Sequence, residues 1–410
     1  MSKDIKKTTL ENGLTIITKK TTTLPIITLK IFLKSGSVYD PPGQKGLANL
    51  TLSVLSKGTK KRTNEQIAEE IESLGSSIGI GCGEDFCDIG MGITRKNLKK
   101  GFEILADVLL NPTFPQEEIE KEKVVVLAAI KSRQDHIFNV AYDELRKNMF
   151  GEHPYAGIPL GVAEDIKNIS RDDLINWHKK HLTAPNMLLV VTGNITLFEI
   201  KKLIKEYLPD LSSEKVSQIE IKPVLPIKKE ITEKKNFEQA YVMFGYTCPA
   251  VVSDDYIKLK LLDFYLGGGM SSILFQELRE KAGLGYEVNS FYSSKKYESP
   301  FVIYIGLDEK FINKAEEKVK TLVEEVKYSV DSKHLQDAKN HLEGVYLLDH
   351  QSSSKQGWYL GRWEVLGKGY EYDSKYVSEL KKVTAQDVME VAKKYLTENF
   401  VLIKLEAKND

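Results

Sequence analysis

The sequence predicts an α+β fold built from two homologous domains, each a mostly antiparallel sheet packed against helices. Strand-like and helix-like hydrophobic periods are mixed along the chain, without the regular alternation that a doubly wound parallel sheet requires. Two blocks, Gln66–Leu109 and Ile273–Val326, share one order of features: a helix, a glycine stop, two strands around a polar turn, and a second amphipathic helix. Gly75 and Gly283 mark the equivalent helix ends. They lie about half of the 410-residue chain apart, so we expect a duplicated domain rather than a short repeat.

The first half begins with signals for strands. Asn12-Gly13 separates two short segments rich in Thr and Ile and predicts a hairpin turn. The next segment alternates apolar and mostly polar residues, which is typical of a half-buried strand with one face toward a core. Its inward positions are Ile27, Leu29, Ile31 and Leu33.

Helical signals follow. Thr63–Gln66 reads TNEQ, a capping box that begins a helix. Apolar residues at helical spacing then mark the buried faces of two helices; they are Ile67, Ile71 and Leu74 on the first, and Leu98, Phe102, Leu105 and Leu109 on the second. The range Gln116–Phe150 predicts one or two long helices, and the apolar run Met187–Val191 predicts a buried strand.

The seam between the two domains is predicted at residues 212–227. This stretch is polar and contains Pro223 and Pro226, which is typical of a linker. The expected division is therefore an N-terminal domain at 1–211, the linker, and a C-terminal domain at 228–410.

Composition excludes several classes of protein. Lys and Arg number 58, Asp and Glu also 58, so nothing favours nucleic acid or an anionic membrane surface as a partner. The N-terminal residues lack the apolar core of a signal peptide, and no apolar run is long enough to span a membrane. The three cysteines, Cys82, Cys87 and Cys248, form no CxxC pair, so we expect no disulfides and a cytoplasmic location.

The segment Gly46–Thr59 reads GLANLTLSVLSKGT. Its frame resembles the signature helix of the pitrilysin/insulinase-type metallopeptidases, the inverted zincins. In that family the helix carries His-x-x-Glu-His, in which both His bind zinc and the Glu activates water. The corresponding positions here hold Asn49, Leu52 and Ser53. The amide and the hydroxyl at the two His positions are not the thiolate, imidazole or carboxylate ligands that zinc needs.

A second segment supports the same interpretation. Val124–Ile130 reads VVVLAAI and is similar to the family's helix that supplies the third ligand, a Glu, and Ala129 stands at that position. Gly151–Tyr155, which reads GEHPY, also resembles the family's sequence and fixes the register. The resemblance implies that this chain keeps the scaffold of the family and binds no metal itself.

The third resembling segment, Leu266–Tyr286, retains its polar side chains. In the C-terminal domain of the family, an Arg and a Tyr seven residues apart face the zinc site of the opposite domain. The corresponding residues here are Arg279, in the last turn of a helix that Gly283 ends, and Tyr286, at the start of the next strand. A guanidinium can hold a substrate carbonyl with a forked pair of donors, and a phenol can donate to the developing oxyanion.

Three glycines precede this pair. Gly267, Gly268 and Gly269 come after a helix and are not followed by Gly-Lys-Ser/Thr, so they do not form a phosphate-binding loop. In the related mitochondrial processing peptidase, a glycine-rich loop of the non-catalytic subunit handles substrate. The resemblance therefore gives these glycines a substrate-binding role, and a helix stop is the alternative.

The histidines offer no competing site. His178 and His181 read HKKH on a predicted helix, without an acidic partner motif. His334, His341 and His350 are spread along a polar helix and are expected at the surface.

The resemblance implies a function in trans. The chain would be the zinc-less subunit of a heterodimeric zinc peptidase, inactive alone, supplying Arg279 and Tyr286 to a homologous partner that carries HxxEH and the zinc. Its substrates would be peptides, and the isolated chain could form a homodimer. The rival is a non-enzymatic structural or peptide-binding homologue. The retained Arg279 and Tyr286 favour the first interpretation, because a pure scaffold has no use for a transition-state donor.

Overall fold

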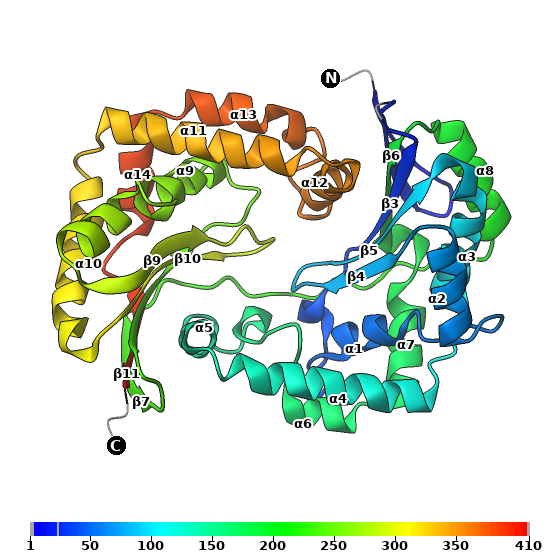
Figure 1. Cartoon of the computed structure of the whole chain (residues 1–410), viewed down its shortest axis with the longest axis horizontal. Coiled ribbons are helices and arrows are strands. Elements are labelled where there is room, and N and C mark those ends of the chain that lie inside the picture. Colours follow the sequence, from blue (N-terminus) through cyan, green and yellow to red (C-terminus); the bar gives the residue numbers. More distant parts are fainter. Residues whose placement is uncertain (1–3, 23, 408–410) are drawn as a thin grey trace. The chain divides into compact units, whose positions relative to one another are not determined.

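The computed structural model describes residues 4–22 and 24–407 (Figure 1). The chain forms two compact units that are not contiguous in sequence. Unit 1 contains residues up to 132, residues 157–220 and residues 349–374. Unit 2 contains residues 133–156, residues 221–348 and the chain from 375 onward. Each unit therefore includes a segment from the other half of the sequence.

Unit 1 holds a six-stranded sheet in the order β1-β2-β6-β3-β5-β4. Its strands are β1 (Ile5–Thr9), β2 (Thr15–Lys20), β3 (Ile26–Leu33), β4 (Ile78–Cys82), β5 (Cys87–Thr94) and β6 (Met187–Gly193). Its helices are η1 (Ser37–Tyr39), α1 (Leu47–Val54), α2 (Asn64–Ser73), η2 (Arg95–Asn97), α3 (Leu98–Leu110), α4 (Gln116–Arg133), α6 (Ala163–Asn168), α7 (Arg171–His181), η4 (Ala184–Asn186), α8 (Leu197–Tyr207) and α12 (Ser353–Val365).

Unit 2 holds a five-stranded sheet in the order β7-β11-β8-β10-β9. Its strands are β7 (Lys229–Lys235), β8 (Ala240–Cys248), β9 (Gly285–Tyr292), β10 (Ser299–Leu307) and β11 (Phe400–Ala407). Its helices are α5 (Ile137–Phe150), η3 (Pro154–Ala156), α9 (Tyr256–Gly267), η5 (Phe275–Lys281), η6 (Glu309–Phe311), α10 (Ile312–Val326), α11 (Ser332–Asp349), α13 (Tyr372–Lys382, of which the first three residues belong to unit 1) and α14 (Ala385–Tyr395).

The two sheets confirm the predicted pair of α+β domains. Apart from the extra strand β1, the order β2-β6-β3-β5-β4 repeats as β7-β11-β8-β10-β9, with the first pair of strands parallel and the others antiparallel in both. Gly75 and Gly283 adopt left-handed φ angles of 67° and 61° at the equivalent helix ends. The shared topology and the shared backbone conformation both indicate duplication.

Two helices are exchanged between the halves of the sequence. Helix α12, from the C-terminal half, packs on β3 and β6 in unit 1, where Gly361 lies so close to Phe32 that an added Cβ would be 2.0 Å from the ring (Figure 1). Helix α5, from the N-terminal half, packs on β8 and β11 in unit 2, and Gly245 allows Met149 the same close approach. Each sheet therefore has one face covered by chain from the other half.

The exchange corrects one prediction. The strand at 27–33 was expected to be half-buried, but β3 is buried on both faces. Ile27, Leu29, Ile31 and Leu33 belong to the core beneath α3 and α7, as expected. On the other face, Phe32 is fully buried in a smaller cluster with residues of α12. The sequence around β3 could not reveal a covering helix that lies more than 300 residues later.

The other local predictions are confirmed. Gly13 lies in the turn between β1 and β2, which pair antiparallel. Thr63 and Gln66 make both bonds of the capping box, and β6 is fully buried. The predicted stripes of α2 and α3 face the core, and the range Gln116–Phe150 divides into two helices, α4 and α5.

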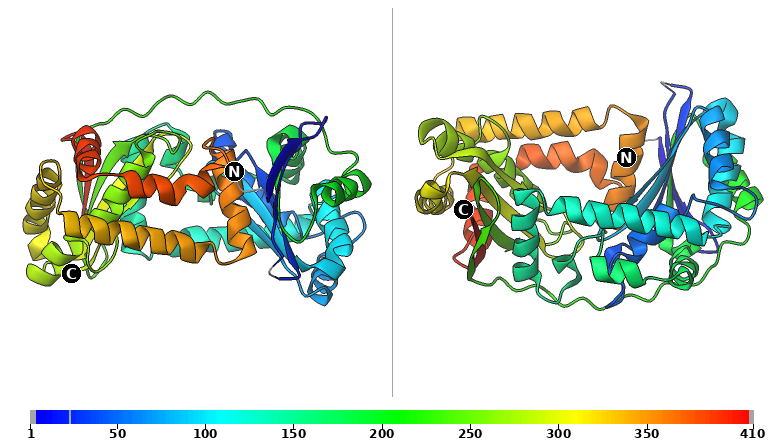
Figure 2. Two further views of the ribbon diagram at one scale, coloured as in Figure 1. Left: turned by 90° about the horizontal axis from the view of Figure 1, so that it is seen from above. Right: turned by 60° about the horizontal axis from the view of Figure 1, so that its bottom comes forward.

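Residues 212–227 carry neither helix nor strand, and most of them are exposed. Figure 2 shows this connection as a long green line, and the two compact units meet along the sequence inside it, between Glu220 and Ile221. Within residues 4–22 and 24–407, every helix is too short or too polar to traverse a lipid bilayer.

Candidate functional site

The helix at the resembling segment Gly46–Thr59 is held by contacts around its first turn. Gly46 has a φ of 98°, and an added Cβ would be 2.6 Å from both the Leu160 carbonyl oxygen and Ile166 Cδ1. Asp40, which is buried, accepts hydrogen bonds of 2.9 Å from the backbone N–H groups of Gly46 and Ala48. Burial raises the pKa of Asp40 to about 7, against the opposing effect of these two donors. The framework that positions α1 is therefore intact.

The side chains at the zinc positions do not suit a metal. Leu52 is 1% exposed and packs in the core. Ser53 Oγ donates a 3.0 Å hydrogen bond to the Asn49 carbonyl oxygen in the preceding turn. Ala129 lies half-buried on α4. Across the described part of the chain, no group of three or more His, Cys, Asp or Glu side chains is arranged to hold a metal ion. The residues at these positions therefore provide no ligand set for zinc.

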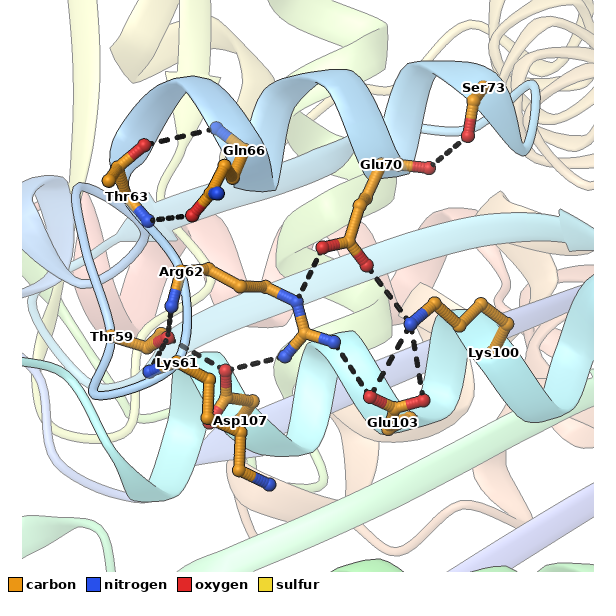
Figure 3. A network of polar contacts seen from close by, with 10 residues as sticks. All are labelled: Thr59, Lys61, Arg62, Thr63, Gln66, Glu70, Ser73, Lys100, Glu103 and Asp107. Carbon is orange, nitrogen blue, oxygen red and sulfur yellow. Dashed lines mark hydrogen bonds and ion pairs between the residues drawn. The ribbon is translucent and has the colours of Figure 1, made fainter.

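A buried ion network fixes the end of the same segment (Figure 3). Arg62 donates from three different nitrogens to Glu70, Glu103 and Asp107, at 3.0, 2.7 and 2.7 Å. Thr59 Oγ1 donates to the same Asp107 oxygen at 2.7 Å. The bond from Arg62 lowers the pKa of Glu70, and a second bond from Arg62 holds down the pKa of Glu103 against its partial burial. This network is structural, because each of the three guanidinium nitrogens donates to one of the protein's own carboxylates.

The HKKH histidines are also structural. His178 Nε2 lies 2.7 Å from the Leu109 carbonyl oxygen, and burial lowers the pKa of its ring. His181 is 2% exposed, its Nδ1 lies 3.0 Å from Ser35 Oγ, and burial lowers its pKa to about 4. Both rings join α7 to the neighbouring backbone and side chains, so neither is available as a ligand.

The histidines of the C-terminal half agree only in part with the prediction. His334 and His341 are exposed on α11, as expected. His350 is not a surface residue of that helix. It lies just beyond the end of α11, and its Nε2 is 2.8 Å from Asp373 Oδ1, with 15% of its side chain exposed. The polar pattern of α11 could not predict that His350 pairs with Asp373, 23 residues further along the chain.

The third resembling segment, Leu266–Tyr286, has the local structure that the sequence predicts. Arg279 lies in η5, a π-helical turn, a form that is frequent at functional sites. Gly283 ends it: the Gly283 N–H donates to the Arg279 carbonyl and the Leu284 N–H to the Leu278 carbonyl. Tyr286 is the second residue of β9 and is 61% exposed.

Arg279 and Tyr286 are in contact. Arg279 Nη1 donates a 3.0 Å hydrogen bond to the Tyr286 carbonyl oxygen, and its guanidinium carbon lies 4.8 Å from the centre of the Phe275 ring. The guanidinium of Arg279 is thus hydrogen-bonded to the backbone of Tyr286, and the phenol of Tyr286 is open to solvent.

The three glycines form the end of α9 and the turn after it. Gly267 lies against β9, where an added Cβ would be 2.2 Å from the Ser290 nitrogen. A Cβ added at Gly268 would be 2.7 Å from the Phe264 backbone, and Gly269 has a φ of 112° beside His341. Close packing and a left-handed turn account for all three glycines, so the helix-stop interpretation explains them without a ligand.

Comparison with known proteins identifies the family. Residues 15–161 match the family model described as insulinase (peptidase family M16), and residues 168–342 match the one described as the peptidase M16 inactive domain. The chain belongs to the M16 peptidase family. The resemblance to this family is thereby confirmed, and the four positions that it assigns to the zinc site hold Asn49, Leu52, Ser53 and Ala129.

M16 relatives match over nearly the whole chain. An uncharacterized zinc protease of Rickettsia bellii is 28% identical over 95% of this chain and 92% of its own, and the uncharacterized zinc protease YmxG of Bacillus subtilis is 27% identical over 97% of both. The solved structure of a protease from Helicobacter pylori has a TM-score of 0.91 at 21% identity, covering 98% of this chain and 99% of its own. That of a peptidase M16 inactive domain from Pseudomonas fluorescens has a TM-score of 0.92 at 23% identity, covering 99% of each chain. These structures share the two-domain α+β fold.

Sequence reasoning missed Asp40 and the helix exchange. Asp40 stands in a loop before the signature segment, and no local pattern marks it as the acceptor for the first turn of α1. The buried network of Arg62 was also missed, although its members recur at helical spacing on α3, where Glu103 and Asp107 are one turn apart.

Proposed function

We propose that this chain is the zinc-less subunit of a heterodimeric M16 peptidase and that it supplies Arg279 and Tyr286 to the partner's active site. The observation that carries the proposal is the contrast within one chain. The three positions for metal ligands hold Asn49, Ser53 and Ala129, and Leu52 replaces the Glu that activates water, whereas Tyr286 remains exposed beside Arg279. In a chain without zinc ligands, Arg279 and Tyr286 can serve catalysis only if another chain supplies the zinc site.

The side chains suit substrate binding and transition-state stabilisation. One N–H of Arg279 donates to the Tyr286 carbonyl oxygen, and this hydrogen bond orients the guanidinium. Its other N–H groups can donate to a backbone carbonyl of a bound peptide. The Tyr286 hydroxyl can donate to the oxygen of the scissile carbonyl as it becomes an oxyanion.

The partner would be a homologous chain with an intact HxxEH, and its zinc would activate the attacking water. This chain would then be inactive alone. Peptides are the substrates that fit this chemistry. The neutral charge balance and sparse cysteines agree with a cytoplasmic site of action, and the isolated chain would be a monomer or a homodimer.

The rival is a structural or peptide-binding homologue without catalysis. One observation favours it: the hydrogen bond to Tyr286 and the stacking on Phe275 already give Arg279 a structural role. The two proposals differ in what the exposed phenol does, so they are separated by activity in the presence of a partner.

The experiment is a reconstitution. This chain and a homologue with HxxEH from the same genome are purified separately, and zinc content, association and hydrolysis of fluorogenic peptides are measured for each chain and for the mixture. We expect no stoichiometric zinc and no hydrolysis from this chain alone, a stable complex, and hydrolysis by the mixture only. One tightly held zinc in this chain, or full activity of the homologue by itself, would overturn the proposal.

A further inference from the structure

The hairpin β4–β5 brings two thiols together. Cys82 ends β4, Cys87 begins β5, and the two are direct partners in the antiparallel register. Their Sγ atoms lie 2.9 Å apart. We propose that Cys82 and Cys87 form a reversible dithiol–disulfide modification site, oxidised by low-molecular-weight disulfides such as oxidised glutathione.

The backbone geometry at this pair is suited to a disulfide. The Gly83 N–H donates to the Phe86 carbonyl at 3.0 Å, which makes residues 83 and 86 the hydrogen-bonded pair next to the turn. Cys82 and Cys87 are then a non-hydrogen-bonded pair, in which Cα atoms are typically about 4.5 Å apart. Disulfides span Cα separations of about 4.4–6.8 Å, so the bond can form without moving either strand.

The chemistry needs only the named oxidant. The Cys82 thiolate attacks a sulfur of oxidised glutathione, forming a mixed disulfide and releasing one glutathione thiolate. The Cys87 thiolate then attacks Cys82 Sγ and releases the second. The protein loses two protons and two electrons, the electrons reduce the oxidant, and two glutathione molecules result. Attack from solvent begins at Cys82, because it is partly exposed whereas Cys87 is buried.

The surroundings make this reaction slow. The neighbouring Cys87 thiol, burial, and the charges of Asp40 and Glu84 all raise the pKa of the Cys82 thiol. A low thiolate fraction excludes a rapid dithiol catalyst and is compatible with a modification that follows sustained oxidation. In a reducing compartment both residues remain thiols.

Oxidation would act on the support of α1. Strand β4 is the edge of the sheet, so only β5 holds its backbone (Figure 1). The turn after Cys82 accepts from η1, with Ser37 N–H donating to the Gly83 carbonyl and Val38 N–H to the Glu84 carbonyl, at 3.0 and 3.1 Å. Helix α1 contacts both β4 and η1. A disulfide would therefore fasten the edge strand and the loop beside the signature helix.

The test uses the full chain, incubated with excess oxidised glutathione and then alkylated. Before alkylation we expect the intact mass to fall by two hydrogen atoms, and after alkylation we expect Cys82 and Cys87 to carry no alkyl group. Reduced glutathione should reverse both changes, and hydrogen exchange of the β4 amides should slow by about tenfold on oxidation. Cys248→Ser should behave as wild type, because Cys248 is buried in unit 2.

The control is Cys82→Ser, which keeps the size of the side chain. It should lose no hydrogen atoms, and its β4 exchange should not respond to the oxidant. The proposal is overturned if wild type stays fully alkylatable under oxidised glutathione. It is also overturned if Cys82→Ser still loses two hydrogen atoms, or if the β4 amides exchange equally fast in both states.

Discussion

The segments around α1 and around η5–β9 both resemble the family in sequence, but their side chains differ in burial and in hydrogen bonding. Each segment has a glycine with a positive φ, Gly46 in the first and Gly283 in the second. In α1, Leu52 at the position of the catalytic Glu is buried in the core, and Ser53 at the second His position donates to the helix backbone. In β9 the Tyr286 side chain remains 61% exposed.

This contrast between the two segments separates residues that serve the fold from residues that the fold does not require. Burial of the Leu52 side chain stabilises the core, and this explains a leucine at that position. An exposed phenol contributes little to folding, and its retention needs another explanation. Substitutions in the first segment should therefore change stability, and substitutions in the second should change chemistry.

The strongest test of this contrast is activity in the reconstituted complex. Tyr286→Phe removes one donor to the oxyanion and should lower turnover on the order of 100-fold to 1000-fold. Arg279→Ala should lower turnover and also raise KM, because substrate placement suffers. Asn49→Ala and Ser53→Ala are the controls and should leave both constants nearly unchanged. If the Tyr286 variant keeps wild-type turnover, the pair is structural. If the Asn49 variant is inactive, the first segment has a chemical role.

The second test compares the two glycines by stability. Gly46→Ala adds a Cβ against the Leu160 carbonyl at a left-handed position, and we expect a loss of about 3 kcal/mol in the free energy of unfolding of unit 1. Gly283→Ala is the matched control, since its Cβ meets no atom within 4 Å, and it should cost only about 1 kcal/mol. Urea denaturation gives both values. Equal losses would mean that close packing at Gly46 does not hold α1.

The third test is the pH dependence of unit 1. His181 has a folded pKa of about 4, below its unfolded value of about 6.5, so the stability it contributes is lost as pH falls through this window. Between pH 7 and pH 5 the loss should be about 2 kcal/mol. Asp40, whose folded pKa is about 7, acts with the opposite sign and should mask it in wild type.

His181→Gln removes the first effect and keeps the second. The variant should therefore be more stable at pH 5 than at pH 7 by about 2 kcal/mol, relative to the same difference in wild type. Urea denaturation at the two pH values measures this. An identical pH dependence in both proteins would show that His181 is already accessible to protons in the folded state.

The smallest effect is expected from cutting the connection. Limited proteolysis should cleave within 212–227 and give two fragments of about half size, if this segment is the seam between two domains. The fragments should nevertheless co-elute in gel filtration, because α5 remains packed in unit 2 and α12 in unit 1. Fragments that separate without denaturant, or cuts confined to 66–109 and 273–326, would contradict this division.

Features that depend on neighbours along the chain could be predicted from the amino-acid sequence. The capping box at Thr63, the glycine stops at Gly75 and Gly283, the stripe on α3 and the turn between Arg279 and Tyr286 all follow from contacts within a few residues. Such contacts leave a readable period or a characteristic residue, so the duplication and the family frame could be recognised.

The contacts between remote segments could not be predicted in this way and are seen only in the folded chain. The tertiary structure placed α12 over Phe32, buried His181 beside Ser35, paired His350 with Asp373 and set Asp40 under the first turn of α1. None of these partners lies on the same helix or strand. The free energy of such contacts comes from burial and from desolvated hydrogen bonds between remote elements. A local pattern shows that a residue needs a partner, but not where along the chain that partner lies.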